Sequence, residues 1–145
     1  MQTTDKILSI LNSMTVGTDP SLKTVLYESS FGANIRLDRN PDPAAILYLM
    51  KGFEIDYSTG LKYDKVDVEI FFGKRCDFAA KGEVIQSVLD SVELIISEFI
   101  SLVFAEKSWK IEGKIVAQTA IAKFDCNMAG YSLQLTLVDR QGECI

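Results

Sequence analysis

The stretch from Glu83 to Phe104, EVIQSVLDSVELIISEFISLVF, is the most apolar run in the chain and constrains most what the chain can fold into. As a helix it would be about 33 Å long, enough to cross a bilayer. Asp90, Glu93 and Glu98 oppose insertion, because together they would cost about 7–10 kcal/mol near the membrane centre. The apolar residues of the run return only about 4–8 kcal/mol. We therefore expect a helix that does not span a membrane.

The apolar side chains of this helix fall on one side of a helical wheel. The stripe consists of Ile85, Val88, Leu89, Val92, Ile95, Ile96, Phe99, Ile100 and Val103. A stripe this broad predicts a helix that lies across a sheet and packs into its core. Leu94 is the exception, since it sits among the polar positions, and we take it as a candidate subunit-contact residue.

Other segments have the periodicity of strands and of one shorter helix. The short helix is expected from Thr4 to about Met14. Strands are expected at Leu22–Ser30, Ala44–Met50, Gly52–Tyr57, Val66–Phe72, Trp109–Phe124 and Tyr131–Asp139. The third and fourth of these alternate apolar and polar residues about a glycine-containing connection, which predicts a hairpin.

Glycines and prolines mark the expected turns and loops. Gly113 is a candidate β-bulge, and Gly130 is expected at a turn before the last strand. Long loops are expected at Phe31–Pro43 and Asp56–Asp64, and Asp77 is a good N-cap for the long helix.

This order of elements predicts the fold class. A helix, three or four strands, a long helix and two further strands indicate one α+β domain spanning residues 1–145. We expect a mainly antiparallel sheet with the one long and the one short helix packed on one face. The alternating strands predict that the other face meets water or a partner.

The sequence contains no histidine, which limits the chemistry available to it. Ser–His–Asp and Cys–His nucleophile pairs and histidine zinc sites are excluded. The pairs Glu54 with Asp56 and Asp67 with Glu69 have the spacing of carboxylates on one strand face, but polar positions of alternating strands have it too. Cys76 lies near Lys74 and Arg75, yet a structural cysteine explains it without any base. We expect no catalytic, cofactor-binding or metal-binding residue, and no enzymatic activity.

The number of cysteines suggests a reducing cytosol, and the net charge argues against nucleic acid as a general partner. The three cysteines, Cys76, Cys126 and Cys144, are widely spaced, so we expect neither a disulfide framework nor a metal pair, in a reducing cytosol. The net charge of −5 argues against broad binding to nucleic-acid phosphates.

The last two-thirds of the chain resembles a known family. A strand VDVEIFFGK leads into the long helix, and a strand-rich segment then ends in FDCNMAGYSLQLTLVD. Over about Ala45 to Asp139 this pattern is similar to tail-terminator-like and head–tail joining (neck) proteins of tailed bacteriophages, particularly those of Bacteroides-type hosts. Its most family-like part is AGYSLQLTLVD.

The resemblance implies a virion structural protein, made in the host cytoplasm, that forms a homo-oligomeric ring at the phage neck or tail end. Its partners would be further copies of itself and neighbouring virion proteins. DNA would pass through the lumen without sequence-specific contact, and no membrane would be involved. Besides Leu94, we expect Tyr57 and Tyr63 to supply subunit contacts, because rim charges alone contribute little.

Two alternatives from other classes stay open. One is a cytosolic acidic binding or inhibitor protein that masks a basic partner, with salt-sensitive affinity. The other is a small histidine-free enzyme that uses carboxylates in a concave pocket.

Overall fold

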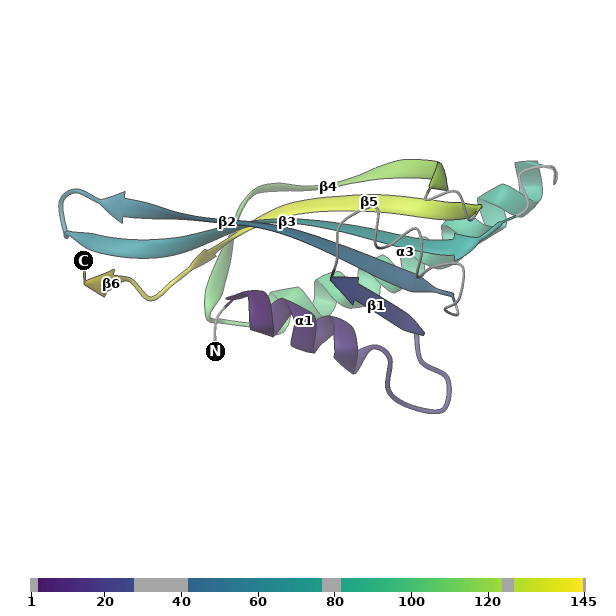
Figure 1. Ribbon diagram of the computed structural model, residues 1–145, viewed down its shortest axis with the longest axis horizontal. Helices are drawn as coiled ribbons and strands as arrows, with labels where there is room; N and C mark the ends of the chain where they lie inside the picture. Colours follow the sequence, from purple (N-terminus) through teal and green to yellow (C-terminus); the bar gives the residue numbers. More distant parts are fainter. Residues whose placement is uncertain (1–2, 28–41, 77–81, 124–126, 145) are drawn as a thin grey trace.

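The computed structural model describes residues 3–27, 42–76, 82–123 and 127–144. In chain order the elements are α1 (Thr3–Ser13), β1 (Thr24–Tyr27), β2 (Ala44–Asp56), β3 (Leu61–Arg75), α3 (Gly82–Ala105), β4 (Trp109–Lys123), β5 (Met128–Asp139) and β6 (Glu143–Cys144). Figure 1 shows the two helices on one side of an elongated sheet. The predicted α+β class is confirmed.

The sheet has six strands in the order β1-β2-β3-β5-β4, with β6 pairing with the start of β3. Only β1 runs parallel to its neighbour, and the other pairings are antiparallel. β1 lies within the strand expected at Leu22–Ser30, of which residues 28–30 lie outside the described residues. The sheet is therefore mainly antiparallel, as the sequence predicts.

The core lies between the sheet and α3. The apolar stripe of this helix faces β3 and β5, and Val92, Phe99 and Val103 are completely buried in it. The rings of Phe72 and Phe99 meet with their centroids 5.4 Å apart. α1 adds further buried side chains, among them Ile7 and Leu11, to the same cluster. The predicted long helix is confirmed, and both helices cover one face.

The β2–β3 hairpin is longer than the sequence predicts. The two strands expected at Ala44–Met50 and Gly52–Tyr57 form one strand of 13 residues. The loop expected at Asp56–Asp64 is wrong, because β3 already begins at Leu61 and pairs in register with β2. That pairing satisfies the backbone N–H and C=O groups that a loop would leave to water. Only residues 57–60 remain as the turn.

Two glycines of the last two long strands have different roles. At Gly113 the backbone is left-handed, with φ 72°, and the register with β5 shifts beside it, so the predicted bulge is confirmed. The predicted turn at Gly130 is wrong, since this residue lies within β5 opposite Gly73. A Cβ at Gly130 would lie 1.8 Å from the carbonyl oxygen of Phe72. The glycine is needed for the close approach of two strands.

Asp77 and most of the expected loop at Phe31–Pro43 lie outside the described residues.

Replacing Val92 with aspartate should unfold the protein. Val92 is fully buried against the sheet, so the new carboxylate would have no water and no cation. Burying an unpaired charge costs about 3–5 kcal/mol or more, a large part of a domain's stability. Thermal melting followed by circular dichroism measures the loss. Leu94→Asp is the matched control, because Leu94 is 73% exposed on the same helix and its substitution should leave the transition unchanged. A normal transition in Val92→Asp would contradict the core assignment.

Gly130→Ala should destabilise the sheet by about 1–3 kcal/mol or more, because β3 and β5 must separate to admit the methyl group. Gly52→Ala is the control, since its Cβ would meet only the carbonyl oxygen of Lys65 at 3.7 Å, an ordinary contact. Denaturant titration of the two variants compares their free energies of unfolding. Equal stabilities would show that β3 and β5 do not approach closely at this position.

Candidate interface site

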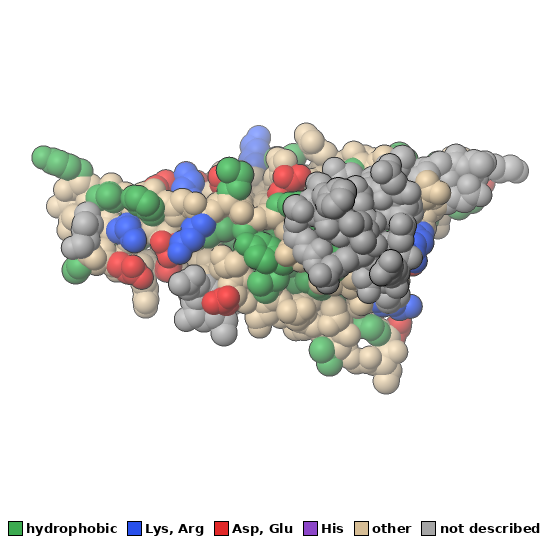
Figure 2. Space-filling view, viewed as in Figure 1, with side chains coloured by type: hydrophobic (Ala, Val, Ile, Leu, Met, Phe, Trp, Pro, Cys, Tyr) green, Lys and Arg blue, Asp and Glu red, His purple; other side chains and the backbone are tan. Residues whose placement is uncertain are grey.

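The β2–β3 hairpin projects beyond both helices and ends away from the core (Figure 1). We call residues 51–65 the hairpin arm. Every residue from Met50 to Gly60 is exposed. Three apolar or aromatic side chains stand out on it: Phe53 is 62% exposed, Ile55 52% and Tyr57 101%. Figure 2 shows hydrophobic side chains gathered at this end of the molecule. The arm therefore presents apolar surface that the described part of the chain does not cover.

The turn at the end of the arm is held by a short hydrogen-bond network. The Asp56 carboxylate accepts from the amide of Ser58 at 2.9 Å and from its hydroxyl at 2.7 Å. These bonds lower the pKa of Asp56, so the carboxylate is charged at neutral pH. The amide of Gly60 donates to the carbonyl oxygen of Asp56 at 2.8 Å, and φ is 69° at Gly60. Tyr57 is thus presented on an ordered turn.

The base of the arm is tied to the sheet by charges. Lys65 on β3 donates to Glu54 on β2 at 3.0 Å and to Glu112 on β4 at 3.3 Å. The two hydrogen bonds raise the pKa of Lys65. On the other face of the arm Lys51 lies 3.9 Å from Asp64. Since these groups are largely exposed, the pairs orient the strands more than they stabilise them.

The predicted contact residues do not form one site. Tyr57 lies at the tip of the arm and Tyr63 is half-buried on β3, whereas Leu94 lies on α3. Phe53 and Ile55 were missed as surface residues. Their alternation with Glu54 and Asp56 is the pattern of a strand with one buried face. Periodicity does not show that this part of the strand extends beyond the region that the helices cover.

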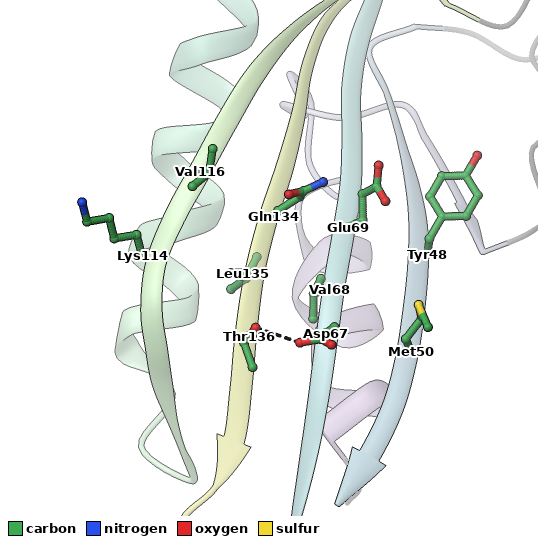
Figure 3. Close-up of a pocket in the computed structure, with 10 residues that line it drawn as sticks. All are labelled: Tyr48, Met50, Asp67, Val68, Glu69, Lys114, Val116, Gln134, Leu135 and Thr136. Atoms are coloured by element: carbon green, nitrogen blue, oxygen red, sulfur yellow. Dashed lines mark hydrogen bonds between the residues drawn. The ribbon is translucent and has the colours of Figure 1, made fainter.

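A shallow hollow lies on the sheet face opposite the helices, and Figure 3 shows its lining. Its volume is about 340 Å³. Side chains of four strands surround it: Tyr48 and Met50 on β2, Asp67 and Glu69 on β3, Gln134 and Thr136 on β5, and Lys114 and Val116 on β4. The register sets these side chains in two rows across the sheet. The hollow is a property of the tertiary fold, because its members are far apart in sequence.

The two acids of the hollow are hydrogen-bonded but form no ion pair in the described part of the chain. The hydroxyl of Thr136 donates to Asp67 at 2.8 Å, and that of Ser132 donates to Glu69 at 3.0 Å. No cation of the described residues lies within ion-pair distance of either carboxylate. Beside them Met50 is 75% exposed and Val116 42% exposed. The hollow thus combines uncompensated negative charge with apolar walls.

The described segments contain neither a cluster of metal ligands nor a membrane-spanning helix. No group of three or more cysteine, aspartate or glutamate residues in them is placed to hold a metal ion. No helix among them is long and apolar enough to cross a membrane. Of the cysteines, Cys76 is buried and Cys144 exposed, and Cys126 lies outside the described residues.

The sequence was also compared with known proteins. It matches no known protein family, and no curated protein is significantly similar to it.

The double substitution Phe53→Thr and Ile55→Thr should leave the protein as stable as before, because both side chains are already in water. Surface changes of this kind are usually worth within about 0.5 kcal/mol each, and threonine keeps a strand preference. Leu47→Thr on the same strand is the control: Leu47 is fully buried, and its loss should cost more than about 2 kcal/mol. Urea titration measures both. A double variant as unstable as the control would place the arm in the core.

Proposed function

We propose that the chain is a structural protein of a tailed-bacteriophage virion, where it assembles into a ring at the neck or tail end. The observation that carries this proposal is the hairpin arm with its exposed Phe53, Ile55 and Tyr57. Grouped apolar side chains on a surface mark interaction sites, whereas single ones are ordinary. The resemblance of Ala45–Asp139 to tail-terminator-like and head–tail joining proteins is the reason for proposing a ring at the neck or tail end.

The arm suits a contact between subunits for energetic reasons. Each square ångström of apolar surface removed from water contributes about 25 cal/mol, and aromatic side chains carry much of the binding energy of interfaces. A side chain such as Tyr57, held on an ordered turn, loses little conformational freedom when it is buried. A projecting arm can also reach a neighbour without disturbing the helix-covered core.

The charge of the chain agrees with a role around DNA rather than in binding it. Acids outnumber bases by 20 to 15, so phosphates are repelled overall. A ring that conducts a genome has to let DNA slide, and tight phosphate contacts would oppose this. In this proposal the partners are further copies and neighbouring virion proteins, the chain has no catalytic role, and it reaches the virion after synthesis in the host cytoplasm.

The alternative of an acidic binding or inhibitor protein has one observation in its favour. Asp67 and Glu69 are exposed on the open sheet face without a counter-charge, as a surface that covers a basic partner would have them. Such a protein would be monomeric alone, and its affinity for the partner would fall steeply with salt. The exposed apolar arm has no part in this alternative, so we place it second.

The purified protein should have a mass above that of the 16.1 kDa monomer, alone or with neighbouring head–tail proteins. Size-exclusion chromatography with light scattering measures the mass, and mass spectrometry of purified phage particles tests for the chain itself. Because the contact is mainly apolar, raising the salt concentration should not dissociate it. A protein that remains monomeric with every neighbour and is absent from particles would refute the proposal and favour the acidic inhibitor.

A further inference from the structure

We propose that the hairpin arm of one copy docks in the hollow on the open sheet face of the next copy, with Tyr57 entering the hollow and Lys62 facing its two carboxylates. This inference rests on the proposed function and specifies the contact between subunits.

A copy cannot fill its own hollow with its own arm. Tyr57 follows Met50 by seven positions along the same hairpin, which corresponds to about 23 Å of extended chain. The arm is a continuation of the sheet that bears the hollow, and its tip points away from it (Figure 1). Bending it back would break the β2–β3 register that extends to Asp56 and Leu61. The occupant must therefore come from another molecule.

The hollow has the size and chemistry for an aromatic side chain with a polar end. Its volume of about 340 Å³ is at the lower end of the range for small-molecule sites, about 300–1,000 Å³. Met50 and Val116 offer apolar walls on opposite sides, and a thioether packs favourably against a ring edge. Asp67 and Glu69 accept hydrogen bonds between these walls. A tyrosine brings a ring for the walls and a hydroxyl that donates to a carboxylate.

The charges of the two surfaces complement each other. Lys62 lies with its ammonium 5.4 Å from the centre of the Phe53 ring and has no ion-pair partner in the described part of the chain. It pairs in register with Ile55, so a cation and two apolar side chains share one face of the arm. The hollow offers Asp67 and Glu69, which form no ion pair in the described part of the chain. Lys114 is its one cationic lining residue and lies on β4 at its side (Figure 3).

The proposed contact joins two different surfaces, which makes it heterologous. Such a contact leaves a free arm at one end of a pair and a free hollow at the other, so copies add head to tail. The repeat closes into a ring when the rotation between neighbours is a whole fraction of a turn. This property connects the contact with the ring that we propose.

Complementation of two variants tests the contact. Tyr57→Asp removes the ring and repels the acids of the hollow, and Gln134→Arg fills the hollow with a long cation. Both residues are exposed, so the fold should persist. Each variant alone should be monomeric, with a self-association Kd raised about thirty-fold or more, as for the loss of a central aromatic anchor. Mixed in equal amounts, the intact arm of one and the intact hollow of the other should give a 1:1 dimer and nothing larger.

Matched controls separate the contact from general effects of substitution. Tyr57→Phe keeps the ring and should still assemble. Ser87→Asp adds an acid to an exposed position of α3 outside both surfaces and should assemble as the wild type does. Lys62→Glu and Glu69→Lys should each weaken assembly, whereas the double variant should regain it because the pair is restored with reversed signs. Light scattering and analytical ultracentrifugation measure these masses.

The results distinguish this inference from the proposed function. If the wild type assembles and enters particles while Tyr57→Asp and Gln134→Arg do so equally well, the docking is wrong and the virion role stands. If the mixed variants form the 1:1 dimer but the chain is absent from particles, the docking stands and the virion role fails. A wild type that is monomeric at every concentration, or variants that do not complement, overturns the docking.

Discussion

The packing of α3 against the two central strands is the interaction on which the rest of the structure depends. Its buried stripe meets alternate residues of β3 and β5, such as Val68, Ile70 and Leu133, and this contact holds the core together. A helix of 24 residues extends about 36 Å, and α3 lies under the part of the sheet away from the hairpin tip, so it leaves the far part of the β2–β3 hairpin bare (Figure 1). The exposed arm is a consequence of the unequal lengths of helix and hairpin.

The same packing explains why the opposite sheet face is a surface for contacts. Both described helices lie on one side, so the side chains of the other side meet water or a partner along most of their length. Among the described residues, the end of this face far from the arm holds a small buried apolar cluster that includes Ile46, Phe71 and Met128. Between this cluster and the arm the face carries polar groups with apolar neighbours. Each central strand has one face packed against the helices and one open face, so apolar and polar residues alternate along it.

Periodicity predicted the elements well and their ends poorly. The stripe of α3 and the alternation of β5 are long enough to identify helix and strand without tertiary information. The segment Leu61–Lys65 contains three charged residues and a turn precedes it, so propensity alone suggested a loop, and pairing with β2 overrode it. Gly130 illustrates the same limit: a glycine suits a turn and a close strand approach equally, and only the register distinguishes them. The sequence could not predict the hollow, because its lining residues come from four strands that only the tertiary fold brings together.

The lysines of the arm bear on how its apolar face can be used. A projecting hairpin with an unpaired strand edge and exposed aromatic residues would by itself invite indiscriminate strand pairing and aggregation. Lys51 and Lys65 are ion-paired within the chain, whereas Lys62 forms no ion pair in the described residues, so stacking of two arms in register would bring two copies of Lys62 together. A partner surface with carboxylates would suit Lys62, and the open face of the sheet offers Asp67 and Glu69. The charge of Lys62 therefore favours an acidic acceptor over a second arm in register, which agrees with a head-to-tail contact.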